Sequence, residues 1–296
     1  MNSHAKRRWK FLKDCILTRN VKVDDDVSVR RFSTFQLLEV EPIDDKRREG
    51  KWLRYESREL GKSSLNIRHL TSDVSPSNLA GFNNTGNICV WPSEEVMAYY
   101  CLKQRDSFDG LAVCELGAGM TGLAALMVGA YSNAAEILVT DGNSQSVQNI
   151  ERNIEANEFD FASKRVKSSI LLWECEADFK EWAGHFDVIL CADGLFFEDS
   201  HDGLIDTMKA LLKPKVRFSP YIYTLHTRRV QGYALHFAPK RKHTLQAFCK
   251  KAEKNFRVEI TEIYDARVWQ KHQQALTLSS YDPDLHYPLM IRLEKY

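Results

Sequence analysis

The sequence predicts an α/β protein built on a Rossmann-like sheet of seven strands, with a small β-rich extension at its N-terminal end. Three observations support this fold class. Apolar runs of strand length alternate with segments of helical periodicity, a glycine turn joins one strand to the next helix, and charged or aromatic residues follow the ends of successive strands. This alternation is typical of right-handed β-α-β units on a parallel sheet.

The glycine turn lies between an apolar strand at 111–116 and a helix of small apolar residues at 122–128. Gly117, Gly119 and Gly122 match the spacing Gly-x-Gly-x-x-Gly, which lets the backbone turn tightly and approach a ligand at a helix N-terminus. The same spacing also occurs in turns that bind no ligand. The residues beside the turn must therefore decide whether it binds a ligand, and which one.

Two carboxylates beside the turn favour one class of ligand. Glu115 stands two residues before the first glycine, and Asp141 follows the next predicted strand, 135–140, where a carboxylate can hold ribose hydroxyls. A dinucleotide would place its pyrophosphate on this turn, where Glu115 would repel it. S-adenosylmethionine instead carries a sulfonium and an ammonium group, which carboxylates attract. We predict S-adenosylmethionine as the cofactor and keep NAD as the alternative.

Composition limits the class of protein. The chain has 296 residues and is 44% hydrophobic, which is enough for a sizeable core. Residues 1–10 are polar and basic, and no apolar stretch reaches the about 18 residues of a membrane span. Seven scattered cysteines form no Cys-x-x-Cys pair, so we expect neither disulfides nor a structural metal. We expect no membrane association and a reducing compartment: the cytoplasm, with the nucleus as a second location.

The formal net charge of +1 hides one strongly basic segment. Residues 213–242 contain eight Lys or Arg and no Asp or Glu, namely Lys213, Lys215, Arg217, Arg228, Arg229, Lys240, Arg241 and Lys242. A solvated surface is the simplest interpretation, and an acidic protein partner or nucleic acid are the alternatives.

The first third of the chain is a separate extension in our interpretation. Residues 9–17 have the pattern of a short amphipathic helix, and residues 27–70 are β-rich around a charged turn at 44–51. A loop at 72–87 follows. We therefore divide the chain into an extension, 1–87, and a catalytic domain, 88–296.

The catalytic domain begins with a strong helix-start signal. Pro92 at a first helical position and two glutamates in the first turn, Glu94 and Glu95, predict a helix running to about 103. Trp91 precedes this helix, where it either packs in the core or forms a wall of the cofactor pocket.

The elements after the glycine turn complete the expected sheet. We predict helices at 144–157, 204–212 and 243–255, and strands at 168–172, 186–191, 232–237, 256–263 and 287–293, the last two forming a terminal hairpin. In open α/β sheets the ligand lies beyond the carboxyl ends of the strands. Four candidate residues stand at such ends, Glu115, Asp141, Trp173 and Asp193.

The chain resembles the seven-β-strand lysine methyltransferases and, within them, the branch that acts on calmodulin. The resemblance covers most of residues 27–296 and rests on the segments 29–32, 83–96, 113–117, 140–143, 184–187 with 191–193, and 285–289. It implies a seven-stranded methyltransferase sheet, S-adenosylmethionine-dependent N-methylation of a protein lysine, and calmodulin or another acidic protein as the partner. A catalytically inactive binding protein of the same fold is the alternative.

The resemblance also implies roles for individual residues. Asp193 and Phe196 carry the Asp-x-x-Phe pattern of the loop beside the target lysine, and we predict them as catalytic. The predicted cofactor-binding residues are Trp91, Glu115, Gly117, Ala118, Gly119, Asp141, Gly142, Asn143, Trp173 and Ala192. An RNA methyltransferase is less favoured, since no Asn-Pro-Pro-Tyr-type motif follows the fourth strand, and nucleic acid is not an expected partner.

Two positions depart from the family pattern. Glu174 follows Trp173, where the family has Asn, Asp or Gly. About 15 residues near 216–231 separate the Lys-Pro turn from the next strand, and we interpret them as an insertion: a basic hairpin, a splice variant or a gene-model error.

The chemistry of lysine methylation constrains the acceptor site. A lysine of pKa about 10.4 is charged at pH 7, and deprotonating it costs about 4.6 kcal/mol. An aromatic channel that excludes water lowers this cost, and Phe196 can hold the methylated product by a cation–π contact. We expect Asp193 to orient the amine, the alternative being that it only caps the following helix.

Overall fold

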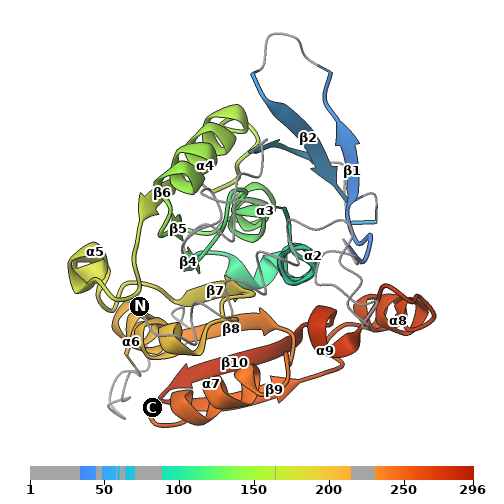
Figure 1. The fold of residues 1–296 in the computed structure, drawn as a ribbon. Helices are drawn as coiled ribbons and strands as arrows, with labels where there is room; N and C mark the ends of the chain where they lie inside the picture. The colour runs from blue at the N-terminus through green and yellow to red at the C-terminus, as the bar shows by residue number, and fades with distance from the viewer. Residues whose placement is uncertain are drawn as a thin grey trace.

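The computed structural model describes residues 34–44, 49–57, 59–60, 64–70, 89–163, 165–214 and 231–296. A central sheet of seven strands dominates it (Figure 1). The strand order is β6-β5-β4-β7-β8-β10-β9. The bounds are β4 (Ala112–Leu116), β5 (Glu136–Asp141), β6 (Val166–Ile170), β7 (Val188–Ala192), β8 (Tyr233–Ala238), β9 (Phe256–Thr261) and β10 (Leu289–Lys295).

The sheet is parallel except for one strand. β4 pairs in parallel with both β5 and β7, β5 with β6, and β7 with β8, whereas β10 runs antiparallel between β8 and β9. The central strands are buried because helices cover both faces, which is why β4 and β8 read as continuous apolar runs. The predicted seven-stranded sheet and its terminal hairpin are confirmed.

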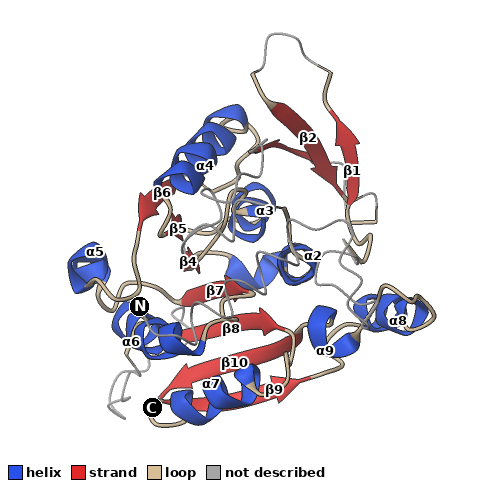
Figure 2. Ribbon diagram, viewed as in Figure 1, coloured by secondary structure: helices blue, strands red, loops and turns tan. Residues whose placement is uncertain are grey.

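Helices form a layer on each side of this sheet (Figure 2). One layer contains α2 (Pro92–Lys103), α3 (Leu123–Tyr131) and α4 (Ser144–Ala156), and the other contains α6 (His201–Leu211) and α7 (Thr244–Ala252). All five match predicted helices to within a few residues. The sequence analysis missed three further helices, α5 (Glu176–Phe179), α8 (Ala266–Ala275) and α9 (Pro283–His286).

The strands match their predicted ranges to within two residues, and the shift of β6 affects a predicted site residue. Residues 168–172 were expected as a strand, but β6 ends at Ile170. The backbone turns at Leu172, whose amide donates to Asp178 Oδ2 (3.0 Å) and whose carbonyl accepts from the Cys175 amide (3.0 Å). Trp173 therefore lies in a turn beyond the strand end.

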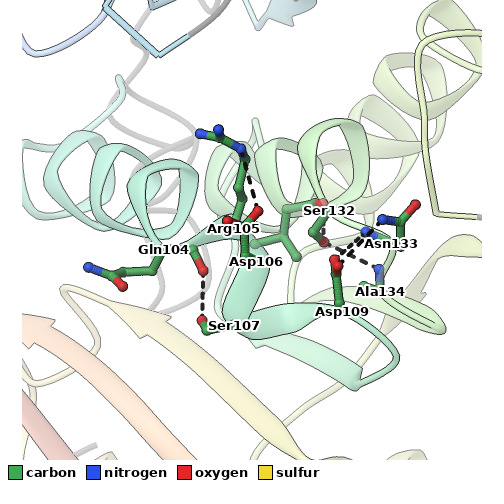
Figure 3. Close-up of polar contacts among 9 residues, drawn as sticks. Gln104, Arg105, Asp106, Ser107, Asp109, Ser132, Asn133 and Ala134 are labelled. Carbon is green, nitrogen blue, oxygen red and sulfur yellow. Dashed lines mark hydrogen bonds and ion pairs between the residues drawn. The ribbon is translucent and has the colours of Figure 1, made fainter.

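The amino end of β4 is fixed by short local hydrogen bonds (Figure 3). A 3-10 turn, η2 (Arg105–Phe108), follows α2, and Ser107 Oγ donates to the Gln104 carbonyl (2.7 Å). The Asn133 amide, just after α3, donates to Asp109 Oδ1 (2.8 Å). These contacts lie at the opposite end of β4 from the glycine turn. They anchor the strand at the end away from the predicted cofactor site.

The extension contributes a second, three-stranded antiparallel sheet in the order β1-β2-β3. Its strands are β1 (Glu39–Pro42), β2 (Lys51–Glu56) and β3 (Ser64–His69). This confirms the predicted β-rich character, while the division at residue 87 stays a prediction. The predicted helix at 9–17, the segments at 29–32 and 83–88, and the predicted insertion up to residue 230 lie outside the described residues.

An asparagine ladder on α4 joins the two sheets. Asn157 exchanges two hydrogen bonds with the backbone of Asn66 in β3 (both 2.8 Å). One turn apart on the same helix face, Asn153 accepts from the Arg68 amide (2.8 Å) and Asn149 donates to the Arg68 carbonyl (2.7 Å). The edge of β3 is therefore paired by side chains, as an additional strand would pair it.

A second contact ties the extension to α2. Both carboxylate oxygens of Glu95 accept backbone hydrogen bonds, from the amides of Phe35 (2.7 Å) and Leu37 (2.8 Å). Pro92 begins α2 as predicted, yet Glu95 faces the extension and not solvent. Within the described part of the chain, no helix is long and apolar enough to cross a membrane.

Candidate active site

The glycine turn is held by hydrogen bonds to the end of β5. Gly117, Gly119 and Gly122 all have φ between 61° and 66°, the left-handed region that favours glycine. The Ala118 amide donates to the Thr140 carbonyl (2.9 Å), and the Gly119 amide donates to Asp141 Oδ2 (2.8 Å). Both amides are therefore engaged with the end of β5, and the turn holds the ends of β4 and β5 together.

Gly122 has a second, steric reason to be glycine. A Cβ at this position would lie 2.7 Å from Val139 Cγ1 in β5. Gly122 is also the N-cap residue of α3. The third glycine of the motif therefore allows α3 to pack closely on the sheet, as expected for this position of a Gly-x-Gly-x-x-Gly turn.

Glu115 is buried behind the turn. Its side chain is at the carboxyl end of β4, and its Oε2 accepts a hydrogen bond from the Ala125 amide in the first turn of α3 (2.8 Å). We predicted that Glu115 attracts the cofactor's positive charges directly or through water. Its position favours an effect through the electric field over direct contact, together with a structural role in fixing α3.

Three buried acidic side chains cluster around the turn. Burial raises the pKa of Glu115 to about 8, that of Glu94 to about 7 and that of Asp141 to about 6, and mutual repulsion contributes to the first two. No Lys or Arg of the described chain forms an ion pair with any of the three. Such a cluster disfavours a pyrophosphate and fits a small cationic ligand such as a sulfonium compound.

Glu94 was not predicted as a site residue. It lies in the first turn of α2, and Thr121 Oγ1, within the glycine turn, donates a hydrogen bond to its carboxylate. The sequence analysis took Glu94 only as a helix-start signal. Its proximity to the turn depends on how α2 packs against α3, which the local sequence does not encode.

The asparagine ladder also reaches the glycine turn. Asn149 donates to the Met120 carbonyl (2.7 Å), and Asn153 donates to the Thr121 carbonyl (3.3 Å). The same two side chains contact β3, so the N-terminal sheet and the turn share supports. The extension therefore contributes to the shape of the predicted cofactor site.

Asp141 and Asn143 organise the segment after β5. Besides the Gly119 amide, Asp141 accepts from the Asn143 amide through Oδ1 (2.8 Å). The Asn143 side-chain oxygen caps α4 by accepting from the amides of Gln145 (2.8 Å) and Ser146 (3.1 Å). Asp141 thus lies beside the turn as predicted, while the Asn143 oxygen is committed to the cap. Gly142 lies between them and is half-buried.

The carboxyl ends of the parallel strands form one edge of the sheet, with the loops after β4 and β5 in one half and the loops after β7 and β8 in the other. Trp173 lies between these two halves. A Cβ at Gly117 would lie 3.0 Å from Trp173 Cζ2, and a Cβ at Gly194 would lie 3.3 Å from Trp173 Cη2. The indole therefore lies against both glycines, between the glycine turn and the loop after β7. Glu174 turns toward α6, where a Cβ at Gly203 would lie 3.1 Å from its Cγ. Trp91 at the start of α2 and Ala192 at the end of β7 are half-buried.

The loop after β7 carries the two predicted catalytic residues. Asp193 has a φ of 57°, unusual for a residue other than glycine, and its amide donates to the Phe237 carbonyl of β8 (2.9 Å). Phe196 is half-buried three residues later. The next long helix, α6, begins only at His201 with Ser200 as its N-cap residue, so the alternative that Asp193 caps this helix is wrong.

Arg241 holds both predicted catalytic residues. Its guanidinium forms an ion pair with the Asp193 carboxylate: Nη2 donates a hydrogen bond to Oδ2 (2.8 Å), and Nη1 lies 2.6 Å from Oδ1. The same guanidinium lies 5.1 Å from the centre of the Phe196 ring. The Arg241 side chain is only 10% exposed, so the interpretation of Arg241 as part of a solvated basic surface is wrong. Neither helical nor strand periodicity links two residues this far apart in sequence.

Two buried histidines lie beneath this loop. His201 Nε2 is 3.0 Å from the Leu195 carbonyl, which fixes the middle of the loop. His236 in β8 is buried against Phe248, and burial lowers its pKa to about 3, so it stays neutral. Sequence reasoning named neither residue, because each reads as an ordinary position in a helix or a strand.

Comparisons with known proteins agree with this geometry. A family model described as lysine methyltransferase matches residues 78–244. A calmodulin-lysine N-methyltransferase from Arabidopsis thaliana is 33% identical over 312 residues, covering 99% of this chain and 97% of that protein.

Solved structures align with this chain only at low identity. A predicted O-methyltransferase from Agrobacterium tumefaciens aligns with a TM-score of 0.44 at 12% identity, covering 64% of this chain and 75% of the other. A Listeria monocytogenes protein assigned to the S-adenosylmethionine-dependent methyltransferases aligns with a TM-score of 0.44 at 13% identity, covering 68% and 99%. Because both TM-scores are below 0.5, the fold class rests on the strand order and register described above.

Proposed function

The chain belongs to the lysine methyltransferase family, whose methyl donor is S-adenosylmethionine, and we propose that it methylates a lysine of calmodulin. The observation that carries the substrate proposal is the similarity, over nearly the whole chain, to a relative with that activity. Similarity confined to the catalytic domain would support only membership of the family, and not a particular substrate. Similarity that includes the N-terminal extension also covers segments outside the family match, and such segments are where substrate choice commonly resides.

We propose that the cofactor lies against the glycine turn, beside Asp141 and Trp173. When bound, S-adenosylmethionine supplies a methyl group on a positively charged sulfur. Its positive charge favours the ionised forms of the buried acids Glu94, Glu115 and Asp141, which then provide the compensating negative field. Asp141 offers its remaining lone pairs to ribose hydroxyls. Trp173 offers an aromatic face for the adenine. Gly117 carries no Cβ that would clash with this ring.

We propose that the acceptor lysine enters beside Asp193 and Phe196. The amine must present a lone pair to the methyl group, so it has to lose its proton to solvent before transfer. Phe196 excludes water from the amine and then holds the methylated cation against its ring. Asp193 accepts a hydrogen bond from the neutral amine and aligns it, and alignment supplies most of the expected rate enhancement.

The direct test is incubation of the purified protein with methyl-labelled S-adenosylmethionine and calmodulin. We expect label on one lysine of calmodulin, located by peptide mass spectrometry, and no label when Asp193→Ala replaces the wild type. A parallel reaction with a cell extract reveals other acceptors. Label on a different protein would leave the family assignment standing and reject calmodulin. Cofactor binding without label on any protein would favour a catalytically inactive binding protein.

Two cations at the rim support an acidic partner. Lys240 and Lys242 follow β8 beside the predicted acceptor loop, and both are exposed. Lys240 lies 3.9 Å from Glu262, a solvated pair that leaves it accessible to a partner. Calmodulin is an acidic substrate in this proposal, and such rim charges raise association rates. A cytoplasmic location, with the nucleus as a second one, is part of the same proposal.

A further inference from the structure

The Asp193–Arg241 pair raises a question about charge in the acceptor site. Asp193 is 12% exposed and Arg241 is 10% exposed, and two guanidinium nitrogens each contact one carboxylate oxygen. Holding such a pair out of water is costly, so its presence beside Phe196 calls for a physical reason. The pair does not close a local turn, because the two residues come from the loops after two different strands, β7 and β8.

A lone carboxylate at this place would oppose the reaction. An opposite charge within about 4 to 6 Å favours the charged form of an ionisable group, commonly by about 1 to 3 pKa units. An unpaired Asp193 would therefore bind the acceptor lysine as an ammonium ion and raise its pKa. The ammonium ion has no lone pair for the methyl group, so tighter binding would accompany slower transfer.

Pairing with arginine removes this problem and keeps the oxygens in place. The guanidinium neutralises the carboxylate, and its fork fixes the plane of both oxygens. The Asp193 carboxylate, whose Oδ1 is buried, retains lone pairs that can accept a hydrogen bond from a neutral amine. Arg241 also covers one part of the Phe196 ring at 5.1 Å, which adds positive charge near the entering amine.

Resting on the proposed function, we propose that Arg241 is a positioning residue that neutralises Asp193, so that the acceptor site selects the lysine as a neutral amine. The backbone of Arg241 is held in place by a contact with α9. Its φ is 42°, in the left-handed region, and its amide donates to the Asp284 carbonyl of α9 (2.7 Å). A residue held in an unfavourable backbone conformation by a neighbouring element is positioned by the tertiary structure.

Other ionisable groups surround the pair and limit what can titrate there. From β7 and β8, Cys191 and His236 are buried, and burial raises the pKa of the Cys191 thiol and lowers that of the His236 imidazole, so both stay neutral. From the loop before α6, Glu198 pairs with His243 (2.8 Å). From α9, Asp284 Oδ2 accepts from the Lys242 amide (2.7 Å).

The experiment compares Arg241→Met and Arg241→Lys with the wild type across pH 6 to 10. The acceptor is a peptide from whichever protein the wild type labels. In the pH profile of kcat, the acid limb is the part where kcat falls as pH decreases. For Arg241→Met we expect this limb to shift to higher pH by about one unit, so that kcat is about tenfold lower at pH 7 and recovers at high pH. Arg241→Lys keeps the charge but not the fork, so its acid limb should stay near that of the wild type while kcat falls at every pH.

A binding measurement separates neutralisation from a merely structural role. Without transfer, Arg241→Met should bind the lysine peptide several-fold more tightly than the wild type at pH 7, as calorimetry with S-adenosylhomocysteine present would show. A peptide in which methionine replaces the acceptor lysine should not gain affinity. Cofactor affinity should be unchanged in all variants.

Three control variants test whether the pH shift depends on the unpaired charge of Asp193. Lys250→Met removes an exposed cation from α7 and should leave the pH profile unchanged. The double variant Asp193→Asn/Arg241→Met replaces the unpaired Asp193 carboxylate with a neutral amide. Its acid limb should therefore return toward that of the wild type, even if kcat stays low. His243→Gln removes the nearby imidazole and should not shift the limb.

The outcomes distinguish this inference from the proposed function. If the wild type labels no protein, the proposed function fails before any variant is compared. If the wild type is active and Arg241→Met lowers kcat equally at all pH values, with weaker peptide binding, Arg241 is only structural and the inference is rejected.

Discussion

The two halves of the carboxyl edge reach similar backbone conformations by different means. In the half after β4 and β5, the left-handed residues are Gly117, Gly119 and Gly122. In the half after β7 and β8, they are Asp193, Arg241 and Lys242. Glycine adopts this conformation without penalty, whereas other residues cost about 1 to 2 kcal/mol each.

The comparison shows how each half is stabilised. In the glycine turn every left-handed position is a glycine, and the turn amides donate to the end of the next strand along the chain, β5. The acceptor half is held by an ion pair and backbone contacts between β7, β8 and α9. Strained residues persist only where surrounding structure over-determines them.

The largest effect should follow loss of the acceptor carboxylate. Asp193→Ala should reduce turnover by about 100-fold or more, because the amine loses its alignment, while cofactor affinity stays within about twofold. Single-turnover kinetics and calorimetry measure the two quantities. Turnover within a few-fold of the wild type would mean that the acceptor half does not depend on Asp193.

The next effect tests the steric requirement of the cofactor half. Gly122→Ala should lower the free energy of unfolding by about 2 to 5 kcal/mol, the sum of left-handed strain and overpacking against Val139. Gly110→Ala is the matched control, since its φ is 72° but no atom lies within 4 Å of the added Cβ. Urea unfolding of both variants separates the packing contribution from the strain. Equal losses would remove close helix packing as the reason for Gly122.

Removing the acid that joins β5 to the turn should weaken cofactor binding. Asp141→Ala should cost about 1.5 to 3 kcal/mol of binding free energy, because the Gly119 amide and the ribose hydroxyls lose a charged acceptor. Calorimetry with S-adenosylmethionine measures it. Asp160→Ala, which removes an exposed acid, is the control. Unchanged affinity in Asp141→Ala would reject the assignment.

The buried acids predict an unusual pH dependence of stability. Glu115 has its pKa raised to about 8 and Glu94 to about 7, whereas unfolded glutamates ionise near about 4.3. Between these values the folded state binds more protons, so the free energy of unfolding should fall as pH rises from about 5 to 8. The slope from one group cannot exceed about 1.4 kcal/mol per pH unit.

Urea unfolding of the cofactor-free protein at several pH values checks this slope. Glu115→Gln should flatten it, because the amide does not titrate. Cofactor affinity of the wild type should rise over the same pH range as the carboxylates ionise. A slope that persists unchanged in the glutamine variant would exclude Glu115 as its source.

The smallest effect concerns Lys240 and Lys242, the two exposed lysines after β8 beside the predicted acceptor loop. Lys240→Glu/Lys242→Glu should slow methylation of calmodulin severalfold at low salt and leave cofactor binding intact, since exposed charges act mainly on association. The difference should fade above about 0.15 M salt, where the screening length is about 8 Å. Arg241 is left unchanged here because it belongs to the site. A salt-independent loss would point to a contact and not to steering.

Local signals in the amino-acid sequence were enough to predict the main elements of this protein. Strand and helix periodicity, Pro92 at the start of α2, and the three glycines predicted the sheet, its helices and the turn, because each depends on neighbouring residues. Asp141 beside the turn was predictable too, since the next parallel strand must end at the same edge.

Contacts between distant segments of the chain depend on how the layers pack. It placed Glu94 on the glycine turn, turned the Glu115 carboxylate behind that turn, and joined Arg241 to Asp193. It also used the asparagines of α4 to tie β3 to the turn. The physical reason is that periodicity encodes which residues face the core, whereas the partner of a buried charge depends on how the finished layers pack.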